Sequence, residues 1–301
     1  MKISCVIPAK NADDPLLSDL IRSIRAQDFP QEDVEIIVVT EGDSESAKAI
    51  GIRKATGDII CMLCADNMIM ENRVFKIIAE SFLNNPSWSA IYSRTYHHKK
   101  DDNSLNRYFA LIGGNDPVCY YLGKNDRQPH VFDLIRRSNY QPSYGCNGFF
   151  YRASEIKATN LDHYYPMDNA MEVPGVFMPM LSGSIWHRTA DGFLTFLRKR
   201  YKYARDLYCD RNDRRWKMLD TREDYWHLFT FIFFTLTIIE PVYVSIRGFI
   251  GKRDPAWFWH WPVCAGMLFT YGILVCRNVL KSRLSFRHWQ GPKVSKPVLH
   301  P

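Results

Sequence analysis

The sequence predicts an α/β protein built on a mostly parallel, doubly wound sheet. Three short runs, 3–8, 34–39 and 58–64, are rich in β-branched residues and apolar nearly throughout, as expected for strands covered on both faces. Helix-like stretches follow each run, which gives a β-α-β-α-β-α order. Such alternation predicts crossover helices and a ligand site beyond the carboxyl ends of the strands.

The helices that follow the strands are predicted at 16–26, 44–55 and 74–83. The first and the third place apolar side chains at helical spacing on one face, which predicts that this face packs on the sheet. These side chains are Leu17, Leu20, Ile21 and Ile24 in the first helix and Val74, Ile77, Ile78 and Phe82 in the third.

Residues 84–190 are irregular, with strand candidates at 88–93 and 148–151. A further helix is predicted over 192–208, with Arg198, Lys202 and Arg205 on one face. We therefore expect an α/β domain over 1–190 with two halves, 1–95 and 96–190. A basic helical linker over 191–224, a hydrophobic hairpin over 225–280 and a basic tail over 281–301 would follow.

Two apolar segments in the C-terminal third predict contact with a membrane. Residues 227–246 are about long enough to cross a bilayer, although Glu240 and Pro241 interrupt them, and 256–276 carry tryptophans at one end, as in an interfacial belt. Three arrangements fit this pattern: a spanning hairpin, helices lying in the interface, and buried core helices.

Charge is divided unevenly along the chain. Residues 1–180 hold 19 Lys and Arg against 23 Asp and Glu, whereas residues 181–301 hold 20 against 9, a net charge of +11. A basic C-terminal part suggests an anionic partner. Nucleic acid is disfavoured because the basic residues flank apolar segments and no nucleic-acid-binding module is present.

The eight cysteines do not have the spacing of a small secreted domain, and no signal peptide precedes the first strand, so reduced thiols in the cytosol are expected. Cys61 and Cys64 have CxxC spacing, but no second pair follows at zinc-site distance, so metal or redox use of this pair is disfavoured.

Polar groups follow each predicted strand: "PAKNADD" (8–14), "TEGDS" (40–44) and "CADN" (64–67). Carboxylates such as Glu41 and Asp43 can accept hydrogen bonds from a ribose or a base, and Asp66 could hold a divalent cation that bridges phosphate oxygens. Asp43 or Ser44 could instead cap the helix that follows.

The stretch from "CVIPAKN" to "CMLCADN" (5–67) resembles the N-terminal half of the family 2 glycosyltransferases, which have the GT-A fold. The shared features are the "IPA.N" start, Gln27 at a helix end, "EIIVV" before an acidic turn, a "GD" helix end and a DxD-like motif. The resemblance resumes weakly at 144–152, 164–173 and 184–206. It implies a Rossmann-like GT-A sheet and a hexosyltransferase that depends on a divalent metal, Mg or Mn, and uses a nucleotide-sugar donor.

The resemblance also implies site residues. Asp66 and His187 would hold the metal, and Asp168 would be the catalytic base, with Glu172 as a substitute. The remaining residues would contact the nucleotide (Pro8, Ala9, Asn11, Glu41, Asp43, Lys48, Ala65), the donor sugar (Cys64, Asn67), the acceptor (Asn147, Gly148) and the diphosphate (Arg198, Lys202). Alternative roles are a helix cap for Asp168 and a structural histidine for His187. The basic face with Arg198, Lys202 and Arg205 could instead bind anionic lipid head groups or be merely solvated.

The sequence departs from the family pattern in four places. Thr40 and Glu41 replace two aspartates, Ala49 replaces an asparagine, Cys64 replaces the first Asp of the DxD motif, and Met167 replaces a glutamate. Cys64 therefore suggests an altered sugar pocket, although a protein without catalytic activity is also compatible.

The function implied is inverting transfer of a sugar, with UDP the expected nucleotide, to a lipid-linked glycan at the cytoplasmic face of the cell membrane. A polyprenyl phosphate acceptor, which needs no base, and a non-catalytic membrane protein with this fold are alternatives. A nucleotidyltransferase is disfavoured, because "PAKNADD" is acidic and lacks the glycines of a phosphate-binding loop. The oligomeric state is not indicated.

Overall fold

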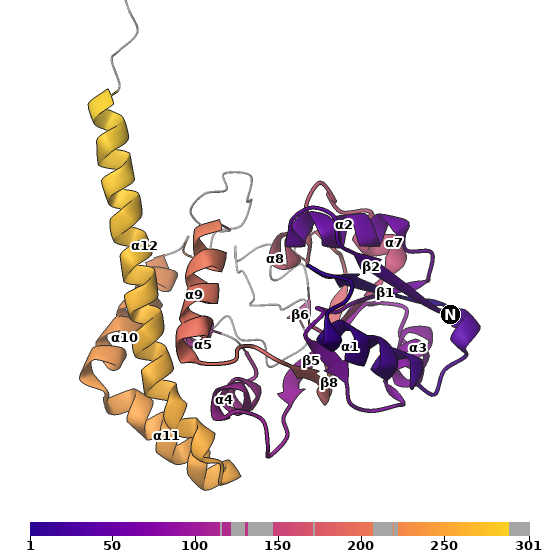
Figure 1. Ribbon diagram of the computed structural model, residues 1–301, viewed down its shortest axis with the longest axis horizontal. Helices are drawn as coiled ribbons and strands as arrows, with labels where there is room; N and C mark the ends of the chain where they lie inside the picture. The colour runs from indigo at the N-terminus through magenta and orange to yellow at the C-terminus, as the bar shows by residue number, and fades with distance from the viewer. Residues whose placement is uncertain are drawn as a thin grey trace, which may run out of the picture.

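A mixed sheet forms the centre of the protein in the computed structural model (Figure 1). The structure describes residues 1–114, 116–121, 130–131, 147–170, 172–206, 219 and 222–288. The strand order is β2-β1-β3-β7-β5-β8-β4, and β6 pairs with β8. The strands are β1 (Ile3–Pro8), β2 (Val34–Val39), β3 (Ile59–Met62), β4 (Asn67–Ile69), β5 (Trp88–His97), β6 (His130–Val131), β7 (Phe149–Arg152) and β8 (Val176–His187).

Strand direction confirms the predicted α/β class with a mixed sheet. β1 is parallel to β2 and to β3, and β5 is parallel to β8. β7 is antiparallel to both β3 and β5, so β5 and β8 run in the same direction as the first three strands. β4 and β6 pair with β8 in the antiparallel sense.

Helices cover both faces of the sheet. Because side chains alternate along a strand, Ile3, Cys5 and Ile7 of β1 pack on one face and Val6 packs on the other. α1 and α3 lie on the first face, and α2 and α7 on the second (Figure 1). The bounds are α1 (Pro15–Arg25), α2 (Ser44–Lys54), α3 (Val74–Asn84), α7 (Ala153–Lys157) and α8 (Pro166–Ala170), with the short 3-10 turn η1 (Gln31–Asp33) before β2.

A separate helical layer packs beside the sheet (Figure 1). Buried side chains such as Phe109, Phe196 and Met267 form its own apolar core. The layer consists of α4 (Ser104–Ile112), α5 (Pro117–Tyr121), α9 (Phe193–Ala204), α10 (Arg222–Thr237), α11 (Ile239–Lys252), the 3-10 turn η3 (Pro255–Trp259) and α12 (His260–His288).

The first apolar segment of the predicted hairpin, which Glu240 and Pro241 interrupt in the sequence, forms two helices, α10 and α11. The first arm is broken at Ile238, which has a φ of 64°, and α10 and α11 meet at a bend of 81°. Pro241 explains part of the break, because proline removes a backbone donor and is tolerated only in the first turn of a new helix. The second arm forms one helical segment, 255–280, that is long and apolar enough to cross a membrane.

Candidate functional site

The carboxyl ends of β1, β2, β3 and β8 and the start of β7 share one edge of the sheet. Pro8 pairs with Val39, and Val6 pairs with Met62, so β1, β2 and β3 end together. The Gly148 N–H donates to the carbonyl of Met62, which places the start of antiparallel β7 at the same edge. The end of β8 arrives there through its pairing with β4.

The turn after β3 is held by its own polar side chains. The Asn67 N–H donates to the Cys64 carbonyl at 2.9 Å, and Asn67 Oδ1 accepts from the Cys64 N–H at 2.8 Å. This turn sends the chain back as β4, where Asn67 lies opposite His187 of β8. The predicted DxD-like turn is therefore positioned against a strand end that is 120 residues further along the chain.

Asp66 and His187 face each other in this turn. Asp66 Oδ1 lies 3.6 Å from His187 Nε2, with side-chain exposures of 32% and 8%. The distance is too long for a hydrogen bond, and Asp66 Oδ1 is buried without a hydrogen-bond partner among the residues that the structure describes. The Arg188 N–H, which donates to the Asp66 carbonyl at 3.1 Å, fixes the backbone of the pair.

His187 is held as a neutral ring. Burial lowers its pKa, the Asp66 carboxylate opposes this, and the charge of Lys199 lowers the pKa further. The Thr189 hydroxyl lies 3.4 Å from Nδ1 and can accept its proton. Asn147 Nδ2, an amide donor, also lies 3.5 Å from Nδ1, so the contacts fit either tautomer; where Nδ1 carries the proton, Nε2 and Asp66 Oδ1 face each other as two electron-pair donors.

Asn147 and Tyr96 complete this group. The Asn147 Nδ2 lies 3.4 Å from the Tyr96 hydroxyl and 3.5 Å from His187 Nδ1, and the Tyr96 ring centroid lies 5.2 Å from that of His187. Within the described part of the chain, Asn147 Oδ1 and Asn67 Nδ2 are also buried without a hydrogen-bond partner. Buried polar atoms without partners are costly, and a group of them at one edge is typical of a ligand site.

Gly148 lies beside this group for a backbone reason. Its φ is +74°, and an added Cβ would lie 2.5 Å from Cγ1 of Ile185 in β8. Only glycine fits a left-handed position with so close a neighbour. The structure thus gives a packing reason for glycine at this position. The role in acceptor binding that the resemblance implies stays a prediction.

Two predicted nucleotide-binding acids lie in the turns at the same edge. Asp43 is the N-cap of α2, where its Oδ1 accepts from the Ser46 N–H at 2.8 Å, in agreement with the capping alternative. Glu41 is exposed in the turn after β2. Asn11 is exposed after β1, and its Oδ1 accepts from the Asp13 N–H at 3.1 Å. Pro8 and Ala9 end β1, and the Ala9 N–H donates to the Val39 carbonyl.

Other predicted residues lie on α2, α8 and α9 and in the turn after α8. Lys48 is buried in α2, with its Nζ 3.4 Å from Glu45 Oε1. Asp168 is buried in α8. The segment before α8 is attached to the start of α2, because the Tyr164 N–H donates to the carbonyl of Glu45. Glu172 accepts from the Asn160 N–H at 2.8 Å. Arg198 and Lys202 are exposed on α9.

Lys199 was missed in the sequence. Its Nζ donates to the Thr189 carbonyl at 3.2 Å, and its charge acts on His187. It stands next to Arg198 in the chain, but on the side of α9 that faces the end of β8. In the sequence, only the run "RKR" within a predicted helix pointed to Lys199.

The donor set fits a cation that arrives with a phosphate ligand. Within the described part of the chain, no group of three or more His, Cys, Asp and Glu side chains could hold a metal ion. Asp66 and His187 would supply two ligands, and Ala65 and Cys64 belong to the same turn. Mg²⁺ and Mn²⁺ are commonly bound by one or two protein ligands together with substrate phosphates and water. Of the CxxC pair, Cys61 is buried within β3 and Cys64 lies in the turn that follows.

Comparison with known proteins gives no family assignment. No protein-family model matches the sequence, and no curated protein matches it. Similar solved structures include S. aureus TarS residues 1–349 (12% identity, TM-score 0.41, covering 90% of this chain and 92% of that one). The same TarS fragment in complex with UDP-GlcNAc is 13% identical (TM-score 0.44, 81% of this chain and 79% of that one).

A third similar structure is a mannosyltransferase, PcManGT from Pyrobaculum calidifontis, in complex with GDP-Man and Mn²⁺ (12% identity, TM-score 0.45, 96% of this chain and 82% of that one). At TM-scores below 0.5 the likeness decides neither fold nor function, so both rest on the residues and contacts of this chain. Those contacts define an α/β protein with a polar, partly unsatisfied site at the carboxyl edge of its sheet.

Proposed function

We propose that the protein is a metal-dependent glycosyltransferase that takes a sugar from a nucleotide-sugar donor, with UDP as the expected nucleotide. The observation that supports this most is the pair formed by Asp66 Oδ1 and His187 Nε2, which lie 3.6 Å apart, while Oδ1 is buried and has no hydrogen-bond partner among the described residues. Such a pair is stabilised by a cation, and the cation site lies where α/β sheets bind nucleotides.

The diphosphate is the leaving group of such a reaction, and it needs positive charge. A bound cation would neutralise the departing phosphate oxygens as a Lewis acid. Lys199 supplies a second positive charge near the same edge, because its Nζ is fixed on the Thr189 carbonyl. Arg198 and Lys202 remain candidates for the diphosphate, but they are exposed on the other sides of α9.

The sugar and nucleotide contacts follow from the turns. Glu41 and Asn11 present acceptors for ribose hydroxyls or a base N–H at the ends of β2 and β1, with Pro8 and Ala9 supporting the base. Asn67 and Asn147 each have a buried polar atom without a partner, which suits hydrogen bonds to sugar hydroxyls. Cys64, where an aspartate is the family's usual residue, would select among sugars.

The chemical step would be an inverting displacement. The acceptor oxygen attacks the anomeric carbon, the bond from this carbon to the diphosphate oxygen breaks, and Asp168 takes the acceptor proton. Asp168 is buried on α8 near the start of α2. A polyprenyl phosphate acceptor is already ionised and would not need this base.

The acceptor we favour is lipid-linked and lies at the cytoplasmic face of a membrane, because an apolar helical layer packs directly beside the catalytic sheet. The test is a transfer assay with purified full-length protein, UDP-GlcNAc and GDP-Man as donors, membrane lipid extract as acceptor, and Mn²⁺ or EDTA. Transfer with Mn²⁺ and none with EDTA is expected. Absence of both transfer and donor hydrolysis under all conditions would overturn the proposal.

Asp168→Asn then separates the two acceptor classes. A hydroxyl acceptor predicts a loss of about 100-fold or more in kcat, the usual contribution of a general base. Full turnover by the variant would identify a phosphate acceptor instead. Asp162→Asn is the matched control, because this carboxylate is 84% exposed.

A further inference from the structure

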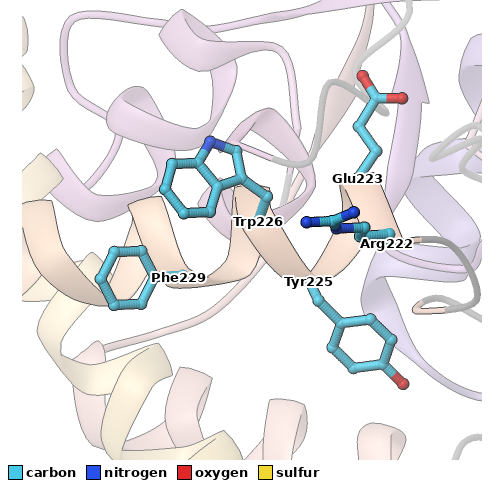
Figure 2. Close-up of a pocket in the computed structure, with 5 residues that line it drawn as sticks. All are labelled: Arg222, Glu223, Tyr225, Trp226 and Phe229. Carbon is cyan, nitrogen blue, oxygen red and sulfur yellow. The ribbon is translucent and has the colours of Figure 1, made fainter.

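The helices α10, α11 and α12 carry a continuous set of exposed apolar side chains. On α10 they recur every three or four residues, and the same spacing continues on α11. The two stripes are Trp226, Phe229, Phe233 and Leu236 on α10, and Ile239, Tyr243, Ile246 and Ile250 on α11. Figure 2 shows Tyr225, Trp226 and Phe229 projecting from the start of α10, where they line an open hollow with Arg222 and Glu223.

From this surface and its attachments we infer that the three helices lie within one leaflet of an anionic membrane and do not cross the bilayer. The inference extends the membrane contact named in the proposed function, and it rests on the helices alone. The partner is the lipid surface itself, with the apolar stripes in the acyl region and the flanking cations at the head groups.

The turn between α11 and α12 argues against a spanning hairpin. In such a hairpin this turn would emerge on the side of the membrane away from the sheet. Instead, Asp254 forms an ion pair of 3.1 Å with Arg107 of α4, and the Trp259 Nε1–H donates to Ser104 Oγ at 2.8 Å. The turn is therefore attached to the helix that directly follows β5.

From Gly266 onward, α12 is attached to α9 in the same way. Gly266 lies so close to Phe193 and Leu197 of α9 that an added Cβ would be 2.8 Å from the Phe193 ring. Further along, Tyr271 contacts the Asp116–Arg200 ion pair, and Arg277 donates to the Tyr201 hydroxyl at 3.2 Å. α9 thus runs beside α12 from Gly266 to Arg277, within the segment that could span a membrane (Figure 1).

The charge on α9 makes crossing costly. If α12 crossed the bilayer, α9 would have to enter it together with the exposed cations Arg198, Lys199 and Lys202. Charged side chains in the hydrocarbon region are strongly disfavoured unless they are paired. A helix lying in the leaflet avoids this, because one side of α12 faces α9 and the other, with Phe269 and Ile273, faces lipid.

Charge also favours an anionic lipid surface over a second protein. Arg247, Lys252 and Arg253 are exposed at the end of α11, beside the apolar stripe. The C-terminal part from residue 181 has a net charge of +11, so two copies packed face to face would repel each other. Basic and aromatic residues around an apolar face are typical of helices that bind acidic membranes from one side.

The first test is flotation of the full chain with phosphatidylcholine vesicles and with vesicles containing phosphatidylglycerol. Binding to both, stronger with phosphatidylglycerol and weakened by salt, is expected. Phe233→Glu combined with Ile246→Glu should weaken binding at least about tenfold, since both side chains face the leaflet. Leu83→Glu is the matched control, because Leu83 is 64% exposed on α3, and it should bind as the unsubstituted chain does.

The second test places the turn on one side of the membrane. Gly251 has open space around its Cβ position, so Gly251→Cys can be labelled with a membrane-impermeant maleimide in preformed vesicles, with Leu83→Cys as the control on the sheet side. We expect Gly251→Cys to be labelled at residue 251 without detergent, which gives one adduct more than the unsubstituted chain. The inference would be overturned if the adduct appeared only after detergent, if the chain failed to float, or if the double variant floated unchanged. A dimer that forms without vesicles and that the double variant dissociates would identify a second copy as the occupant. Turnover of the nucleotide-sugar donor is measured separately from membrane binding, so failure of one proposal leaves the other testable.

Discussion

Substitution of Asp66 by asparagine separates function from stability at the candidate site. The variant keeps the shape of the side chain, removes its negative charge and places an amide donor or carbonyl opposite His187 Nε2. If Asp66 holds a cation, the charge benefits only the ligand-bound protein. We therefore expect Asp66→Asn to bind Mn²⁺ and nucleotide more weakly and to be at least as stable as the unsubstituted protein when no ligand is present.

The magnitudes follow from the environment of Oδ1. A buried acceptor without a partner costs about 1–3 kcal/mol, and an amide that donates to the His187 ring would remove this cost. Because the side chain is 32% exposed, the lower end applies, about 1 kcal/mol, or roughly 2 °C in Tm. Loss of even an outer-shell partner weakens metal binding by 10–100-fold, so loss of a direct ligand should cost at least ~100-fold, about 2.7 kcal/mol.

The assays are thermal unfolding without ligand and calorimetric titration of UDP in the presence of Mn²⁺. The control is Asp162→Asn, whose carboxylate lies 3.8 Å from Arg53 and is 84% exposed, and which should change neither quantity measurably. The reasoning is refuted if Asp66→Asn lowers the Tm by several degrees and leaves the Mn²⁺-dependent affinity for UDP unchanged. That result would make Asp66 a structural carboxylate.

Three further outcomes are expected. Gly148→Ala should destabilise the protein by about 1–3 kcal/mol in denaturant titration, because its φ is +74° and Ile185 leaves no space, and an unchanged midpoint would contradict this. Lys199→Gln should raise the KM for the donor about tenfold, through loss of a cation near the diphosphate, whereas Lys54→Gln, on α2, should not. Burial raises the pKa of the Cys61 thiol well above its ordinary value, so its alkylation at pH 8–9 should stay slow while that of the exposed Cys276 accelerates, as peptide mapping of alkylated protein would show.

The first half of the sheet was predictable because its signals are local. The runs at 3–8 and 34–39 became strands with the same bounds, and 44–55 became α2 with one residue fewer. β8 was missed because its pairing is long-range: the strand contains a proline, carries bulges opposite β5 and lacks a continuous β-branched run. The interruption near Glu240 and Pro241 was visible in the sequence, but Pro241 alone does not show whether a helix bends or ends, so the bend at Ile238 was not predicted.

The site was predictable in part for the same reason. Asp66 follows a strand directly, so its place at the carboxyl edge depends only on strand direction. The position of its partner His187 depends on the β4–β8 pairing, which the pattern of residues does not predict. Only the resemblance suggested that His187 lies near the metal. Lys199 depends on the rotation of α9 against the end of β8, and no periodicity in the sequence reports that.

The central claim is that Asp66 and His187 hold a cation together with a nucleotide diphosphate. Pulsed electron paramagnetic resonance of Mn²⁺, bound to the full chain with UDP or GDP, tests this directly. The account predicts phosphorus coupling from the nucleotide and nitrogen coupling from one imidazole, with the nitrogen coupling lost in His187→Gln. Nucleotide-bound Mn²⁺ without any imidazole coupling, or no nucleotide-dependent Mn²⁺ binding at all, would contradict it.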